Sequence, residues 1–204
     1  MKAAAVGLRA HSGWTSLVVV ASEKGKPAVL ARQRPHLVQT FSYAFRQPYH
    51  TAERMTLDEA EDFLGRQQSE ARRLAGQALE AVRRDAAQRG YQVARAALLT
   101  ASGRPLPELA KILAAHSLIH AADGEFFRQA LLHACKAHSL AVTAIKDREL
   151  LAAGGAKFKR GPAALARLLV ELGKPIGPPW SQDEKFATLA AWLALKSRIG
   201  SCLA

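Results

Sequence analysis

Short apolar runs separated by turn residues dominate the first part of the chain. Residues 3–9 and 14–21 are rich in Ala, Val and Leu, and residues 27–33 follow a Glu-Lys-Gly-Lys turn. Apolar runs of this length, bounded by glycine and charged residues, predict three β-strands, the last two joined as a hairpin. The second run contains three consecutive valines starting at Val18, which is typical of a central strand covered on both faces. We therefore expect the chain to begin with a three-stranded meander.

The aromatic segment that follows, residues 34–54, allows two interpretations. Phe41, Tyr43 and Phe45 alternate with small residues, an arrangement that suits an edge strand with one packed face. A loop held in place by its aromatic side chains explains the same pattern equally well.

Helical spacing of apolar residues is most regular over residues 56–90, where Ala and Leu recur every three or four positions. Thr56 and Glu59 have the spacing of a capping box at the start of this helix. A continuous helix of this length would be roughly 50 Å long at 1.5 Å per residue, which exceeds the diameter of a compact domain of this size. It must bend near Gly65 or Gly76, or project and pair with another chain. We expect a homodimer in which helix 56–90 packs antiparallel to its copy through its Ala-rich stripe.

Strands and helices alternate through the rest of the chain. Residues 93–100 and 140–145 are predicted to form buried strands. Helices are predicted at about 106–114, 124–138, 147–153, 162–172 and 181–199, with a flexible basic segment after the third of them. Asp123 is placed to cap the helix that starts at residue 124. A meander followed by alternating helices and strands predicts one α/β domain, residues 1–204, with a mixed sheet.

Charge suggests a class of partner. The 204 residues include 29 Lys and Arg against 17 Asp and Glu, a formal net charge of +12. Such a surplus favours DNA or RNA as a partner, because cations release counterions from phosphate, although a high-GC genome rich in Ala and Arg codons would give the same composition. No apolar run is long enough for a membrane span or a signal peptide, so we expect a cytoplasmic protein without a membrane partner. Cys135 and Cys202, with no C-x-x-C pair, predict neither a disulfide framework nor a structural zinc site.

Four segments resemble parts of a known superfamily. They are VGLRAHSG at 6–13, ALLTASG at 97–103, VTAIKDREL at 142–150 and DEKFATLAA at 183–191. In order and character they resemble the first, fourth and fifth strands and the last helix of ribonuclease-H-like proteins, in particular RuvC- and YqgF-type resolvases. The resemblance implies a ribonuclease-H-like mixed sheet with flanking helices, into which helix 56–90 is inserted.

The resemblance also implies an acidic metal site, and here the sequence departs from the family pattern. Arg9 stands where resolvases carry their first acid, and Thr100 or Ser102 where they carry the second. Asp183, with Glu184 beside it, matches the last acid. Two-metal cleavage of a phosphodiester needs several carboxylates around ions about 4 Å apart, whereas a guanidinium repels Mg²⁺. We therefore predict a protein that is not an enzyme and has no cofactor; Asp183 is the best candidate for a catalytic residue if one exists.

The leading functional hypothesis is a non-catalytic module that binds branched or structured DNA or RNA. The residues expected to contact nucleic acid are Arg9, Arg104, Lys157, Phe158, Lys159 and Arg160. The last four lie in a Gly- and Lys-rich segment, 153–161, which can follow a phosphate backbone while its aromatic ring stacks on a base; a solvated loop explains the same composition.

The alternative hypothesis is an enzyme whose cleft has been rebuilt at the same sheet edge. It would be a divergent metal-dependent nuclease, which needs Mg²⁺, or a nucleotide or small-molecule binder. The residues expected to line the cleft are His11, Ser12, Ser102, Lys146, Asp147 and Lys185.

A weaker candidate for metal binding consists of His116, His120 and Asp123. Their spacing of i, i+4 and i+7 would place them on one face of a continuous helix, as a site of two histidines and one carboxylate requires. Asp123-Gly124 is typical of a helix start, however, so we expect the three to straddle a break and predict no metal site.

Overall fold

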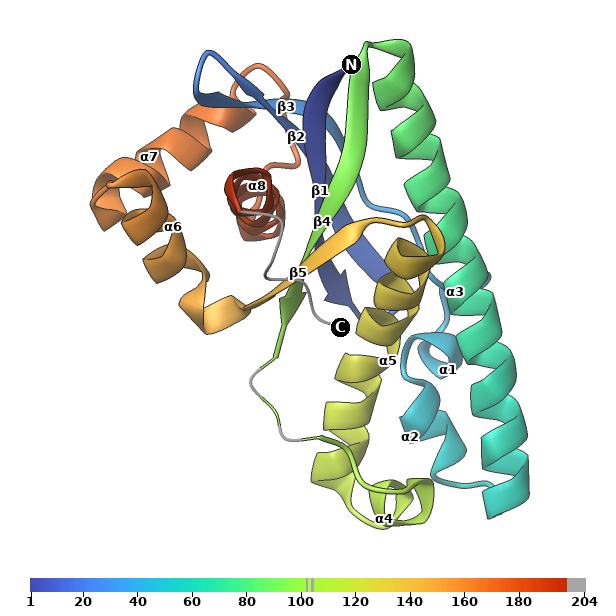
Figure 1. Cartoon of the computed structure of the whole chain (residues 1–204). Helices are drawn as coiled ribbons and strands as arrows, with labels where there is room; N and C mark the ends of the chain where they lie inside the picture. Colours follow the sequence, from blue (N-terminus) through green and yellow to red (C-terminus); the bar gives the residue numbers. More distant parts are fainter. Residues whose placement is uncertain (102, 104, 198–204) are drawn as a thin grey trace.

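A computed structural model describes residues 1–101, 103 and 105–197. Its strands are β1 (Lys2–His11), β2 (Trp14–Glu23), β3 (Lys26–Gln33), β4 (Tyr91–Thr100) and β5 (Ala141–Lys146). They form one sheet in the order β3-β2-β1-β4-β5. β2 pairs antiparallel with both β1 and β3, whereas β4 pairs parallel with β1 and β5. The predicted meander and mixed sheet are confirmed (Figure 1).

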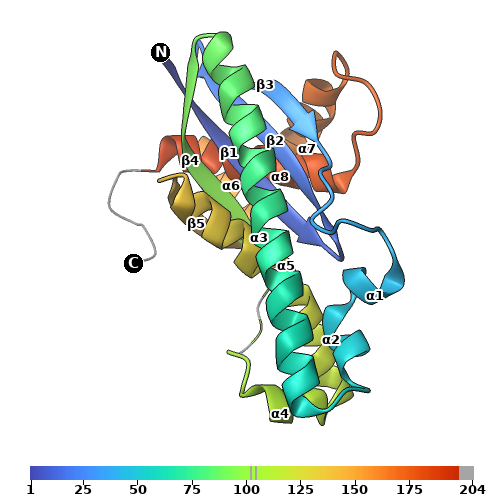
Figure 2. The same ribbon diagram turned by 90° about the vertical axis from the view of Figure 1, so that its right-hand side faces the viewer.

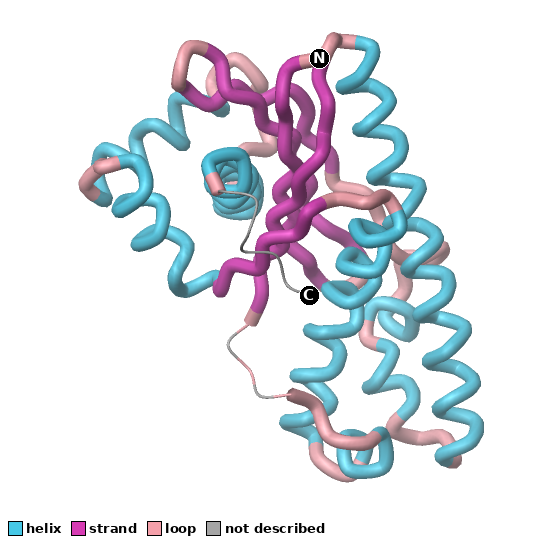
Figure 3. Tube along the Cα trace, viewed as in Figure 1, coloured by secondary structure: helices cyan, strands magenta, loops and turns pink. Residues whose placement is uncertain are grey.

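Helices cover both faces of this sheet (Figure 3). They are α1 (Tyr43–Arg46), α2 (Pro48–Ala52), α3 (Leu57–Gln88), α4 (Leu109–Leu113), α5 (His116–Ala137), α6 (Leu150–Phe158), α7 (Pro162–Gly173) and α8 (Gln182–Lys196), with a 3₁₀ turn η1 (Asp147–Glu149) before α6. Because strand residues alternate between faces, Val6 and Leu8 of β1 join a core with α3 and α5, while Ala5 joins a second core with α6, α7 and α8. Within the described residues, no helix is long and apolar enough to cross a bilayer.

α3 is one uninterrupted helix. Its N-terminal half extends beyond the sheet and lies beside α5, α2 and α4 (Figure 2). The predicted capping box is present, since Thr56 and Glu59 each accept a hydrogen bond from the other's backbone N–H. The apolar stripe of the helix is buried within the chain, at Ala60, Leu64, Ala71, Ala75, Leu79, Val82 and Ala86. The predicted homodimer required this stripe to be free. Its own chain covers it instead, which removes the basis of that prediction.

Two segments differ from their predicted structure. Residues 43–46 form α1, which is neither the edge strand nor the loop considered for this segment, and the ring of Phe41 stacks on His36 with centroids 4.3 Å apart. The helix predicted to start at residue 124 starts at His116 and runs through Asp123. The side chain of Asp123 does not cap this helix but bonds to His50. A glycine inside a helix costs about 1 kcal/mol, a penalty that burial of one face of α5 outweighs.

α8 packs directly against β1 at Gly7, where no space is left for a side chain. A Cβ atom on Gly7 would lie 1.9 Å from the carbonyl oxygen of Ala187 and 3.1 Å from the nitrogen of Ala191. Only a residue without a side chain therefore allows this contact. Since the side of α8 that faces the sheet is rich in buried alanine, neither partner holds the other away. The contact fixes the distance of α8 from the strands.

This contact predicts that Gly7→Ala destabilises the protein by about 3 kcal/mol, because the added methyl group meets backbone atoms that cannot rotate away. The free energy of unfolding is measured by urea denaturation. Gly65→Ala is the matched control: its Cβ would meet nothing within 4 Å, and replacing a helical glycine should raise the stability by about 0.5–1 kcal/mol. Equal stability of Gly7→Ala and the wild type would refute the close approach.

Candidate functional site

A charged cluster forms where the parallel strands end. Arg9 lies near the end of β1, Asp147 directly follows β5, and Asp183 lies in the first turn of α8. Parallel strands bring their carboxyl ends to one sheet edge, and α8 reaches the same edge. Nη1 of Arg9 donates to Oδ1 of Asp183 at 2.7 Å, and Nη2 donates to Oδ2 of Asp147 at 2.8 Å. One guanidinium thus bridges two carboxylates from separate elements.

The environment of Arg9 strengthens these ion pairs. The side chains of Arg9 and Asp183 are each only 19% exposed, so water screens their attraction less than it would at an open surface. The guanidinium also lies over the ring of Phe186, 5.1 Å from its centroid, which favours a cation at this position. Removing Arg9 would leave two facing carboxylates without their main partner. Arg9 was expected to contact phosphate, but its donors are already engaged by acids of its own chain.

A second cation, Arg34, ties the start of α8 to the sheet just after β3. Its Nε donates to Oε1 of Glu184 at 2.5 Å, and its Nη2 donates to Oγ of Ser181 at 3.0 Å. Ser181 and Glu184 also form a capping box at the start of α8. The two residues have the S-x-x-E spacing that is the sequence signature of such a box. Arg34 is a residue that sequence analysis missed, because nothing in its spacing relates it to Glu184.

Glu184 is a fully buried carboxylate with ionic partners. Its side chain has 0% exposed surface. Burial by itself raises the pKa of Glu184, but hydrogen bonds from Arg34 and Ser181 outweigh it and bring the pKa to about 2. The carboxylate is therefore charged at any pH near neutrality and holds α8 to the sheet through Arg34.

Some of the residues predicted to line a cleft join this cluster. Nε2 of His11 lies 3.0 Å from Oδ1 of Asp183, and its ring stacks on Trp14 with centroids 4.2 Å apart. Asp147 is bound to Arg9 as described above. Lys185 follows Glu184 on α8 and is half-buried.

The other predicted cleft residues make different contacts or lie outside the described residues. Lys146 is exposed and pairs with Glu149 at 3.4 Å. The carbonyl of Ser12 accepts a hydrogen bond from Arg46 at 3.3 Å. Ser102 lies outside the described residues, as does Arg104, which was expected to contact nucleic acid. The structure therefore brings His11 and Asp147 to the cluster but not Lys146.

The basic segment predicted to be a flexible loop is helical as far as Phe158, the last residue of α6. The ring of Phe158 stacks on Trp192 of α8, with centroids 3.4 Å apart and planes 7° from parallel. The Trp192 side chain of the same chain therefore covers one face of the Phe158 ring, which was expected to stack on a base. Lys157, Lys159 and Arg160 are exposed at the end of the helix.

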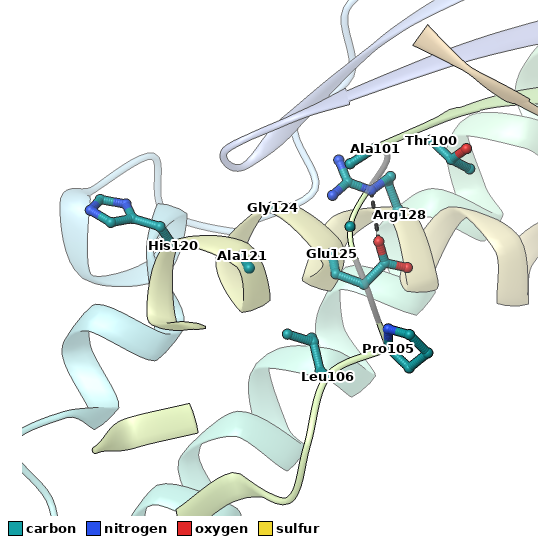
Figure 4. A pocket seen from close by; sticks show the side chains of 10 residues that line it. Thr100, Ala101, Pro105, Leu106, His120, Ala121, Gly124, Glu125 and Arg128 are labelled. Carbon is teal, nitrogen blue, oxygen red and sulfur yellow. Dashed lines mark hydrogen bonds and ion pairs between the residues drawn. The ribbon is translucent and has the colours of Figure 1, made fainter. Parts of the chain in front are cut away.

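A hollow of about 620 Å³ lies beside the end of β4 (Figure 4). Leu106 and Gly124 line it, and at one end Nε of Arg128 donates to Oε2 of Glu125 at 2.8 Å. Its lining includes neither Arg9 nor any acid of the charged cluster. The hollow is therefore distinct from the cluster.

The charged cluster does not fit a two-metal centre. The guanidinium of Arg9 binds both Asp147 and Asp183, so a cation already occupies the space between these carboxylates. In the described structure Oδ1 of Asp147 has no hydrogen-bond partner, but one carboxylate oxygen beside a cation is not a ligand set for Mg²⁺. Cys135 offers no nucleophile either, because burial raises the pKa of its thiol to about 12.

The lowered pKa of Glu184 predicts that the free energy of unfolding decreases in acid. The pKa of Glu184 is about 2 in the folded chain, against an ordinary value of 4.5. Its contribution to stability is therefore complete above about pH 4.5 and is lost as the pH falls toward 2. The free energy of unfolding in urea should fall more between about pH 5 and pH 3 for the wild type than for Glu184→Gln. Glu171→Gln, at an exposed ion pair with Lys174, should keep the wild-type slope. Identical slopes for the wild type and Glu184→Gln would contradict this assignment.

Comparisons with known proteins identify the fold. No family model and no curated protein matches the sequence. The structure is similar to that of T. thermophilus RuvC in complex with a Holliday junction substrate, with 15% identity, a TM-score of 0.52, and coverage of 93% of this chain and 90% of that chain. A Thermus thermophilus RuvC structure matches at 16% identity and a TM-score of 0.52, covering 93% and 92%. The predicted resemblance is confirmed for the fold: this chain has a ribonuclease-H-like fold of the RuvC kind.

Proposed function

We propose that this chain is a non-catalytic module that binds structured DNA or RNA, in which Arg9 replaces the metal ions of a nuclease. The observation that carries the proposal is the placement of one guanidinium 2.7 and 2.8 Å from two carboxylates at the sheet edge. T. thermophilus RuvC, whose fold is similar, has been solved with a Holliday junction substrate. This supports branched nucleic acid as the class of ligand.

The chemistry of Arg9 explains why the site would not cleave. A divalent ion assists hydrolysis because it has open coordination positions, where it lowers the pKa of a water and holds the leaving oxygen. A guanidinium neutralises carboxylates equally well, but it has no position for a water ligand and does not lose its own proton. Acids bound to Arg9 therefore keep a structural role without the catalytic one.

The charged cluster itself is a poor site for phosphate. Its two guanidinium groups, from Arg9 and Arg34, face the three carboxylates of Asp147, Asp183 and Glu184. The cluster therefore has no surplus positive charge with which to attract an anion. A nucleic acid would have to be held by cations outside it.

The cations at the end of α6 meet this requirement. Lys157, Lys159 and Arg160 are exposed, and among the described residues none of them lies within 4.0 Å of a carboxylate. α6 starts directly after η1, and its last residue lies roughly 12 Å along the helix from Leu150 at 1.5 Å per residue. We assign these three side chains to the phosphate backbone of a bound nucleic acid.

Binding is expected to be strongly salt-dependent, because neutralised phosphates release counterions. Fluorescence anisotropy with a labelled four-way junction should show a Kd that rises steeply between about 50 and 200 mM salt. The triple variant Lys157→Gln/Lys159→Gln/Arg160→Gln should bind more weakly and lower the slope of log K against log salt by up to ~2.7, about 0.9 for each lost contact. The matched control removes three exposed lysines of another surface, Lys2, Lys24 and Lys26, and should change the slope less.

The outcomes separate the parts of the proposal. Undetectable or salt-independent binding would reject nucleic-acid binding altogether. Equal effects of the two triple variants would reject the end of α6 as the contact surface. Incubation with junction DNA and Mg²⁺ or Mn²⁺ should give no cleavage, and cleavage that Asp183→Asn abolishes would show that the site is catalytic.

A further inference from the structure

Three histidines converge where α2 meets the start of α5, away from the charged cluster. His50 comes from α2, and His116 and His120 come from the first turns of α5. One ring nitrogen from each of the three histidines lies within 4.8 Å of one ring nitrogen from each of the other two. Nε2 of His116 and Nε2 of His120 are only 3.1 Å apart. These three histidines, which we call the His triad, gather their basic nitrogens in one place.

A buried carboxylate orients the first member of the His triad. Oδ2 of Asp123 lies 2.5 Å from Nδ1 of His50, while Oδ1 accepts a hydrogen bond from the backbone N–H of Tyr49 at 2.8 Å. The Asp123 side chain is only 6% exposed, so its position is fixed by packing. A carboxylate bonded to one nitrogen of an imidazole holds the proton there and leaves the other nitrogen, Nε2, as a lone-pair donor. The same arrangement of carboxylate and imidazole is common behind zinc-binding histidines.

The spacing of the His triad suits a small tetrahedral ion. Two nitrogen ligands that each lie about 2.0–2.1 Å from a tetrahedral Zn²⁺ are roughly 3.4 Å apart. The separation of 3.1 Å between His116 and His120 is close to this value. The rings of His50 and His120 have centroids 4.5 Å apart, and those of His50 and His116 5.4 Å apart. Small changes in side-chain torsion would bring all three nitrogens to one ion.

We propose that the His triad is a binding site for Zn²⁺, with Nε2 of His50 and one imidazole nitrogen each from His116 and His120 as its ligands. Three imidazoles favour zinc or a similar transition ion over Mg²⁺, which prefers oxygen ligands. Because His116 and His120 are exposed, the fourth position faces solvent and takes a water molecule. The ion would link α2 to α5 and so hold the aromatic segment against the helical pair.

This site corrects the metal candidate of the sequence analysis. His116 and His120 lie on one continuous helix, as that candidate required, but Asp123 is not the third ligand. Its carboxylate is engaged by His50 and Tyr49, which makes Asp123 a positioning residue. His50 could not be found from spacing, because it is 66 residues before His116 in a segment without a recognisable motif.

Competition with a chromogenic indicator for Zn²⁺ tests the proposal on the full chain. The wild type should bind one equivalent with a micromolar or lower Kd. His120→Ala should weaken binding at least tenfold, and Asp123→Asn by about 10–100-fold because the orientation of His50 is lost. His133→Ala is the matched control: it removes an exposed histidine of the same helix outside the His triad and should leave the Kd unchanged.

A second measurement separates ligand loss from misfolding. Thermal unfolding in a chelator should give the same Tm for the wild type and His120→Ala, and added Zn²⁺ should raise the Tm of the wild type alone. Titration with Co²⁺ should give visible absorption bands of a tetrahedral complex in the wild type and not in His120→Ala. Binding weaker than about 100 µM, or an equal loss of affinity in His120→Ala and His133→Ala, would overturn the proposal. None of these outcomes depends on nucleic-acid binding.

Discussion

The backbone contact at Gly7 determines how close the start of α8 comes to the ends of the strands. Arg9 lies two residues after Gly7 on the same face of β1, so the contact and the ion pairs are adjacent. If α8 were lifted by the width of a methyl group, Asp183 would move away from the guanidinium and Glu184 away from Arg34. Hydrogen bonds of 2.5 to 2.7 Å tolerate little of such movement. The chemistry of the sheet edge therefore depends on one residue without a side chain.

Carboxylates that a fold brings together need a compensating cation. Like charges about 4 Å apart repel each other by roughly 4 kcal/mol at an effective dielectric constant near 20, so Asp147 and Asp183 require a positive group between or beside them. A metal ion meets the requirement and brings reactivity. Arg9 meets it with a permanent charge and two directed hydrogen bonds, at the cost of the open coordination positions that hydrolysis uses. Arg9 thus holds Asp147 and Asp183 together without a metal ion.

Features defined by neighbouring residues could be predicted from the sequence. The strands have local apolar patterns, and both capping boxes, at Thr56 and at Ser181, join residues three positions apart. Interactions between residues that are distant in the sequence have no local pattern from which they could be predicted. Arg9 was expected to contact phosphate. Its actual partners, Asp147 and Asp183, lie 138 and 174 residues away in the sequence, so no local pattern connects them with Arg9.

At Asp123, a local sequence pattern led to a wrong prediction because the residue's true partner is distant in the sequence. Beside Gly124 it has the local signature of a helix cap, yet its partner His50 is 73 residues distant and α5 continues past both residues. Burial of apolar residues on α5 outweighs the local preference, and that burial depends on where α3 and α2 lie. The ion pair of Arg34 with Glu184 was missed for the same reason.

The claim that Arg9 takes the place of a metal ion can be tested by diffraction from crystals soaked in Mn²⁺. Anomalous difference maps locate the ion directly and distinguish the sheet edge from any other site. For the wild type the account predicts no peak between Asp147 and Asp183, with the guanidinium of Arg9 bridging the two carboxylates. Crystals of Arg9→Asp, which presents three carboxylates at the same place, should show a peak there. A manganese peak between Asp147 and Asp183 in the wild type, with Arg9 turned away, would contradict the account.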